Sequence, residues 1–238
     1  MTILAVKSIP LMRGTNNAWK TVPGLFFADR KRDSRSIERH IASRHYDAVI
    51  NLGRVDIDFG NCLGRVFNDP STVRAISTPK ALRRTLDDFI PKYTHIGNHW
   101  HKSRGYGGMG KSFHAETEVS CVGYDGDAQR HIPGLEYRIV TVGDRIVQAS
   151  LKGERRTMLN GRNSFAYSWV GVEGVKNGGF IPLLKEAIRT VPGGQSSVLG
   201  WDVLSLVGET PCIIEVNTCP GVNSATAGRI ISRVKGLL

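Results

Sequence analysis

The stretch Ile213-Ile214-Glu215-Val216-Asn217-Thr218-Cys219-Pro220-Gly221 decides the fold class of this 238-residue chain. Its apolar residues predict a buried strand, and Pro220-Gly221 is expected to end it. Glu215 and Asn217 are two residues apart, so both side chains point to one face of that strand. A carboxylate and an amide oxygen on one face, among apolar neighbours, indicate a binding site for a cation.

A second carboxylate belongs to the preceding strand. An apolar stretch at 197–207 contains Gly200-Trp201-Asp202-Val203. The residues between the two strands, Gly208-Glu209-Thr210-Pro211, are of types that favour a turn. A hairpin would place Asp202 beside Glu215 on the same face. Like charges at that range repel each other, and a bound cation offsets the repulsion. Oxygen ligands favour Mg²⁺. The alternative, a surface hairpin with solvated polar residues, is disfavoured by the apolar neighbours.

Two motifs in these strands resemble those of a known family. Residues 215–221 resemble the Glu-x-Asn-x-x-Pro-Gly signature of the ATP-grasp ligases, and Gly200-Trp201-Asp202 resembles the family's upstream Gly-x-Asp strand. Within the family the chain looks closest to short ATP-grasp proteins of bacteriophages, while ribosomal-protein glutamate ligases and D-alanine ligases look more distant. The resemblance implies ATP and Mg²⁺ as cofactors, with the metal held by Asp202, Glu215 and Asn217.

The first third of the chain predicts a parallel α/β layer, because strand-like and helix-like patterns alternate. The expected elements are a strand at 3–6, a helix at 34–44, a strand at 47–51 and a helix at 79–89. Ser77 or Thr78 is the expected N-cap of the last helix, with Pro79 in its first turn.

The middle of the chain predicts a small antiparallel sheet. The expected elements are strands at 96–101 and 112–122, a turn at 123–130 and a hairpin of strands at 135–142 and 145–151. Helices are expected at 181–190 and 225–237. The predicted fold class is therefore α/β (α+β), in the ATP-grasp arrangement of three lobes. These are an N-terminal α/β lobe at 1–90, a small antiparallel ATP-binding lobe at 91–152 and a C-terminal metal-binding lobe at 153–238.

A glycine-dense loop at 102–111 is flanked by cations. Its glycines would let backbone N–H groups approach phosphate oxygens, and the cations would offset phosphate charge. The glycines are Gly105, Gly107, Gly108 and Gly110. The loop lacks Walker A spacing and the surroundings of a Rossmann fingerprint. Alone it is equally typical of a flexible turn, but beside the acidic motifs it indicates a phosphate site.

The ATP-grasp resemblance implies roles for five further residues. Lys80 and Lys102 match the family's two lysines, one ahead of the small lobe and one on the strand before the loop. Glu136 would accept hydrogen bonds from ribose hydroxyls, and Arg138 would contact a phosphate or acyl-phosphate oxygen. Lys152 falls where relatives carry a cation near the γ-phosphate, so Arg138 and Lys152 are the predicted catalytic residues. The alternatives are an exposed helix-start lysine for Lys80 and a solvated basic loop around Lys152.

Charge and cysteine usage narrow the class of protein. The chain has 32 Lys and Arg against 21 Asp and Glu, a formal charge of +11, which attracts polyanions such as nucleotides and nucleic acid. Four scattered cysteines without a Cys-x-x-Cys pair favour reduced thiols over disulfides or a zinc knuckle. Apolar runs fall short of the about 20 residues that cross a bilayer. We expect a cytoplasmic protein without membrane contact, in the host cytoplasm if a phage encodes it.

The predicted activity, carried over from the resemblance, joins a carboxylate to an amine or a thiol at the expense of ATP, through an acyl phosphate. The implied partners are an unidentified carboxylate and an amine acceptor, with peptides and proteins among the candidates. Two alternatives stay open. One is a non-catalytic nucleic-acid-binding or virion structural protein on the same fold, which the charge supports. The other is an ATP-grasp kinase of a small molecule.

Overall fold

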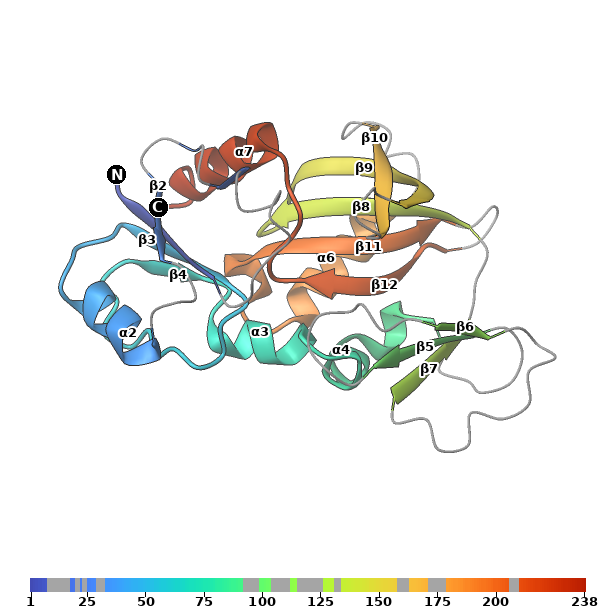
Figure 1. Cartoon of the computed structure of the whole chain (residues 1–238), viewed down its shortest axis with the longest axis horizontal. Helices are drawn as coiled ribbons and strands as arrows, with labels where there is room; N and C mark the ends of the chain where they lie inside the picture. The colour runs from blue at the N-terminus through green and yellow to red at the C-terminus, as the bar shows by residue number, and fades with distance from the viewer. Residues whose placement is uncertain are drawn as a thin grey trace.

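Three β-sheets organise the chain in a computed structural model that describes residues 1–7, 18–19, 22, 25–28, 33–91, 99–103, 112–114, 126–130, 134–157, 163–170, 179–205 and 210–238. Figure 1 shows the two larger sheets next to each other, with the smallest sheet at one end of the molecule. One large sheet is parallel and the other antiparallel, which confirms the predicted mixed α/β class.

A four-stranded parallel sheet, in the order β2-β1-β3-β4, forms the N-terminal part. Its strands are β1 (Ile3–Lys7), β2 (Leu25–Ala28), β3 (Ala48–Leu52) and β4 (Arg65–Phe67). β1 pairs in parallel with both β2 and β3, as the alternation of strands and helices predicted. Helix α2 (Ser34–Ala42) packs on one face through Ile37 and Ile41, both buried with Leu4 and Val6.

Two short helices follow β4. They are α3 (Pro70–Ile76) and α4 (Pro79–Leu86), and the 3-10 turn η1 (Asp87–Phe89) continues α4. Of the two predicted caps of α4, Thr78 is the one used, because its side chain accepts from the Ala81 amide. β4 and α3 were not predicted. Strands of three residues and helices of seven are too short to leave a clear period in the sequence.

A five-stranded antiparallel sheet, in the order β10-β9-β8-β11-β12, forms the centre of the molecule. Its strands are β8 (Leu135–Val142), β9 (Arg145–Thr157), β10 (Asn163–Trp169), β11 (Val198–Ser205) and β12 (Cys212–Asn217). The predicted β8–β9 hairpin is confirmed, with Gly143 at φ 56° in its turn. Its assignment to the small sheet is wrong, because all eight residues of β8 pair with β11. The predicted lobe bound at residue 152 falls within β9.

The small sheet has the order β6-β5-β7. Its strands are β5 (His99–Ser103), β6 (Ser112–His114) and β7 (Gly126–Arg130). The turn predicted at 123–130 is wrong for residues 126–130, which pair with β5 as β7. Gly-Asp-Ala-Gln-Arg has no apolar alternation, so its extended form depends on the hydrogen bonds that β5 supplies. The glycine-dense segment at 104–111 lies outside the described residues.

Helices pack on both faces of the antiparallel sheet. α6 (Phe180–Thr190), followed by the 3-10 turn η2 (Gly194–Ser196), packs against the face that carries Ile139 and Trp201. α7 (Ser224–Lys235) packs on the opposite face, and its Ile230 shares a core with Val140 of this sheet and Ile50 of the parallel sheet. Both predicted C-terminal helices are thus confirmed (Figure 1). Among the described helices, none has the length and apolar character of a membrane span.

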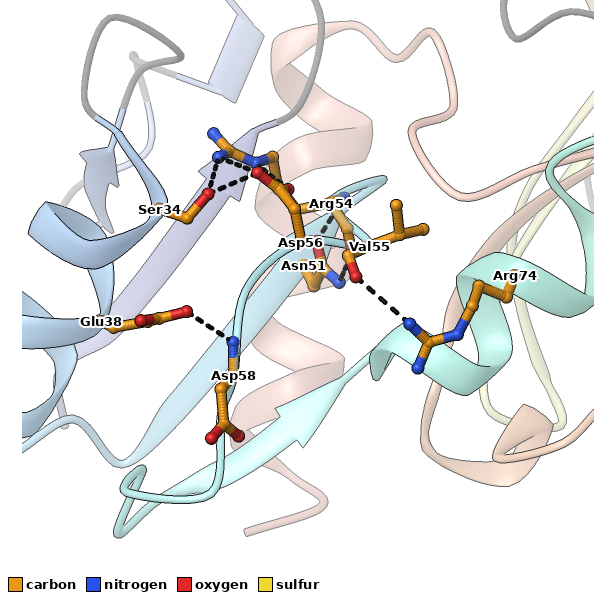
Figure 2. Close-up of polar contacts among 8 residues, drawn as sticks. All are labelled: Ser34, Glu38, Asn51, Arg54, Val55, Asp56, Asp58 and Arg74. Atoms are coloured by element: carbon orange, nitrogen blue, oxygen red, sulfur yellow. Dashed lines mark hydrogen bonds and ion pairs between the residues drawn. The ribbon is translucent and has the colours of Figure 1, made fainter.

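A buried arginine fixes the loop that follows β3. Arg54 is 7% exposed, and its Nε and Nη2 donate to the two carboxylate oxygens of Asp56 at 2.7 Å each. Nη2 also donates to Ser34 Oγ, at the first residue of α2, while Asn51 bonds the Arg54 backbone through both ends of its amide. Figure 2 shows this network between β3 and α2. The hydrogen bond from Arg54 is the main reason that the pKa of Asp56 falls to about 2.

The lowered pKa makes the network sensitive to acid. Asp56 ionises near 3.8 in the unfolded chain and near 2 in the folded one, so its stabilisation is complete above about pH 4 and disappears as the pH falls towards 2. We expect Asp56→Asn to lower the urea midpoint near neutral pH, and we expect its difference from wild type to shrink between pH 4 and 2. Asp58→Asn is the control, since that carboxylate accepts from the Gly60 amide instead. A difference that does not change with pH would contradict the role of the ion pair.

Candidate functional site

The β11–β12 hairpin brings together the three predicted metal ligands. Asp202 lies directly opposite Glu215, and Gly200 lies directly opposite Asn217. Residues paired in this way point to the same face of a sheet, so the oxygens of Asp202, Glu215 and Asn217 share one face. Among the described residues, no three His, Cys, Asp or Glu side chains gather as a metal site. The set therefore consists of two carboxylates completed by the amide oxygen of Asn217.

Gly200 and Pro220 connect the two sequence motifs physically. A Cβ atom on Gly200 would lie only 2.7 Å from Cβ of Pro220, closer than carbon atoms can approach without a shift. Any larger residue at position 200 would therefore displace the turn that follows Asn217. The glycine of the first motif and the proline of the second are two sides of one contact, which holds the end of β12 against β11.

Arg138 provides the main charge partner of Asp202. It lies on β8 directly opposite Asp202, and the two side chains form a bidentate ion pair. Arg138 Nε donates to one carboxylate oxygen, and Nη2 donates to the other at 2.7 Å. Asp202 is only 2% exposed, so its charge needs this compensation. A cation that binds Asp202 must therefore compete with the guanidinium group.

A second ion pair extends the polar row across the sheet. The β8–β9 register sets Glu136 beside Lys152, and Lys152 Nζ contacts Glu136 Oε1. Both side chains are mostly buried. The row thus contains two cations and three carboxylates on four elements of one face, and its members are Lys152, Glu136, Arg138, Asp202 and Glu215. Neighbouring opposite charges keep the row in place without any ligand.

The other predicted site residues lie on different elements. Lys80 is the second residue of α4, where its side chain is exposed, and Lys102 lies on β5 in the small sheet. Gly105, Gly107, Gly108 and Gly110 fall outside the described residues. The five-stranded sheet therefore brings together six of the predicted residues, while the two lysines ahead of the loop belong to separate parts of the fold.

Gln148 and Ser150 lie on the polar face as well, and the sequence reasoning did not select them. Ser150 is paired with Arg138 in the β8–β9 register, and Gln148 is two residues away on β9. Gln148 Nε2 donates to Ser150 Oγ at 3.1 Å, while its buried Oε1 has no hydrogen-bond partner in the described part of the chain. Their spacing could have identified them, because Gln148, Ser150 and Lys152 are two residues apart along one strand and therefore face the same side.

A recess among the described residues lies away from this row. It has a volume of about 630 Å³ and sits between α2, the loop after β3 and the start of α3. Its four carboxylates are opposed by Arg74 alone among its lining residues, and they are Glu38, Asp56, Asp58 and Asp69. Figure 2 shows part of this lining. Such a surface repels phosphates, so this recess does not fit a nucleotide.

A double-mutant cycle tests the buried ion pair. We expect Arg138→Met to lower the free energy of unfolding by about 3–5 kcal/mol, because it leaves the buried Asp202 charge unpaired. Asp202→Asn should also destabilise, and the double variant should lose much less than the sum of the two. The measurement is urea unfolding of all four proteins. Strictly additive losses would show that the two side chains do not interact.

No family model matches the chain, and no curated protein matches it. Solved structures do. The chain is similar to the ATP-grasp ligase PsnB complexed with minimal precursor, with a TM-score of 0.67, 12% identity and coverage of 100% of this chain and 99% of that one. It is similar to D-alanine–D-alanine ligase from Bacillus anthracis, with a TM-score of 0.68, 10% identity and coverage of 100% and 98%.

A third similar structure is the RimK domain ATP-grasp protein from Sphaerobacter thermophilus. Its TM-score is 0.61 at 15% identity, and the alignment covers 97% of this chain and 98% of that one. At such low sequence identities the structural similarity shows the fold alone. The predicted fold class is thereby confirmed, and the chain has the ATP-grasp fold.

Proposed function

We propose that this chain is an ATP-dependent ligase of the ATP-grasp type, which binds Mg²⁺ and ATP over the polar face of β11 and β12. One observation carries the proposal: the register that sets Asp202 opposite Glu215 and Gly200 opposite Asn217. Oxygen ligands on one face of two adjacent strands fit the preference of Mg²⁺. The fold likeness supports the same reading, since PsnB has been solved with Mg and ADP.

The metal would be held by the carboxylates of Asp202 and Glu215 and the amide oxygen of Asn217. When bound, Mg²⁺ would supply positive charge that offsets the negative charge developing on the phosphates during transfer. Glu215 and Asn217 are half-buried at the end of β12, and the Gly200–Pro220 contact fixes that end. The donor set is compatible with the ion on the condition that Asp202 is released from Arg138.

The Arg138–Asp202 pair suggests that metal and nucleotide enter together. Arg138 engages both oxygens of Asp202, so Mg²⁺ alone would have to displace a guanidinium group from a buried carboxylate. Phosphate oxygens of ATP offer Arg138 a replacement anion with matching geometry. In the same way, Lys152 would exchange Glu136 for phosphate, and Glu136 would become available to the ribose hydroxyls. From the family resemblance, we also propose that Lys80, Lys102 and the glycine loop contact the phosphates.

The chemistry proposed for the bound substrates has two steps. A carboxylate oxygen of the first substrate attacks the γ-phosphorus, the bond to the β–γ bridging oxygen breaks, and ADP leaves with that electron pair. An amine nitrogen then attacks the acyl carbon, phosphate leaves, and the nitrogen loses a proton to solvent. Arg138 and Lys152 would stabilise charge on the transferred group by electrostatics and positioning. A thiol in place of the amine would give a thioester by the same route.

The similar ligases indicate which carboxylates to test first. PsnB has been solved with its precursor peptide, and the Bacillus anthracis enzyme is a D-alanine–D-alanine ligase. A peptide side chain and a free amino acid are therefore the two substrate classes that we propose for screening. For both classes we propose an amine acceptor.

Nucleotide binding tests the proposed site without knowledge of the substrate. We expect calorimetry with AMPPNP to show binding that depends on Mg²⁺, and we expect Glu215→Gln to weaken it. In turnover assays the same variant should lose about 100-fold or more, because metal stabilisation of a transition state is worth several kcal/mol. We choose Glu215→Gln because Asp202→Asn would also break the buried ion pair with Arg138.

Glu186→Gln is the matched control, because this glutamate is exposed on α6, where it pairs with Arg189. It should bind as wild type does. Equal Mg-dependent affinity in Glu215→Gln and wild type would refute the metal site. Affinity for nucleic acid that falls steeply with salt, with no Mg-dependent nucleotide binding, would favour the non-catalytic alternative.

A further inference from the structure

Asn68 has an unusual backbone at the junction of the two large sheets. It follows β4 and precedes Asp69, the N-cap of α3. Its φ of 56° makes it the only residue other than glycine with positive φ in the described part of the chain, and it is fully buried. Asparagine tolerates this left-handed region better than most residues, but at some conformational cost. Such a conformation persists where surrounding contacts hold it.

The side-chain amide of Asn68 supplies these contacts. Its Oδ1 accepts from the Val198 amide at 2.7 Å, and its Nδ2 donates to the Val198 carbonyl at 2.9 Å. Nδ2 also donates to the Thr218 carbonyl at 3.1 Å, and the Asn68 backbone amide donates to Ser196. These two hydrogen bonds to the Val198 backbone resemble the pair of hydrogen bonds that two directly opposed residues form in an antiparallel sheet. The Asn68 amide thus extends the hydrogen bonding of the hairpin by one further pair, from the residue that follows β4.

This pair of hydrogen bonds lies at the end of the hairpin that carries the polar face. Val198 is the first residue of β11, two residues before Gly200, and Thr218 immediately follows Asn217. The last described residue pair of the hairpin is Gly200 with Asn217. Beyond it, Asn68 contacts Val198 of β11 and Thr218, the residue that follows β12. The spacing between the start of β11 and the end of β12 therefore depends on a residue that lies about 130 positions earlier.

We propose that Asn68 is a positioning residue for the metal and nucleotide site, acting through Val198 and Thr218 on the alignment of Asp202 with Asn217. The inference rests on the proposed function and extends it to a residue that carries no ligand oxygen. Groups that orient metal ligands from behind change metal affinity by about 10–100-fold when removed. Asn68 meets the structural requirement for this role, because both ends of its amide are used and neither faces solvent.

Two substitutions separate positioning from general stability. Asn68→Asp keeps the acceptor for the Val198 amide and removes both donors. Asn68→Gly accommodates φ of 56° and removes the whole side chain. We expect each to weaken Mg–AMPPNP binding by about tenfold or more in calorimetry, at a temperature where the variant is folded. We also expect excess Mg²⁺ to restore part of the affinity, because the ligands remain present but less well aligned.

Thr72→Val is the matched control. Thr72 is equally buried and belongs to the same connection, but its hydroxyl donates to the Pro192 carbonyl at 2.6 Å and leaves the hairpin untouched. It should lower the urea midpoint and leave the affinity unchanged. If wild type binds Mg–AMPPNP and either folded Asn68 variant binds equally well, the positioning role is overturned and the proposed function stands. If wild type itself does not bind, both are overturned.

Discussion

The register of β11 against β12 is the constraint on which the rest of the site depends. Side chains alternate between the two faces of a strand, so a slip by one residue would send Asp202 to the α6 side and bring Trp201 to the polar side. The fold prevents the slip in three ways: Trp201 is buried against α6, Pro220 packs on Gly200, and Asn68 bonds both strands. These contacts come from three different parts of the chain.

Ion pairs between neighbouring strands stabilise the polar face of the sheet. Arg138 and Lys152 are each paired with a carboxylate, and neither cation points freely towards solvent. Buried ion pairs of this kind contribute little net stability, but removal of one partner strongly lowers the free energy of unfolding. A ligand that brings phosphate oxygens and a divalent cation can replace both partners at once. Under the proposed function, the same electrostatics would favour Mg–ATP over either component alone.

Local sequence patterns were sufficient to predict some elements of the fold and some residues of the candidate site. The apolar strand around Glu215, its partner around Asp202 and the cap at Thr78 all left signals within a few residues, and each has the predicted structure. The polar strand β7 and the short α3 left none. The β8–β9 hairpin was found from sequence, but its sheet was not, since pairing with β11 joins residues about 60 positions apart. Arg138 was predicted to meet phosphate, whereas its pairing with Asp202 required the register. Asn68 escaped notice because a single buried asparagine has no sequence pattern.

The most direct measurement of the central claim is a crystal structure of the chain with Mg²⁺ and AMPPNP. We expect a metal ion at about 2.0–2.1 Å from oxygens of Asp202, Glu215 and Asn217. We also expect Arg138 to have moved from Asp202 to a phosphate oxygen. Nucleotide bound elsewhere, or bound with the Arg138–Asp202 pair intact and no metal on β12, would contradict the claim.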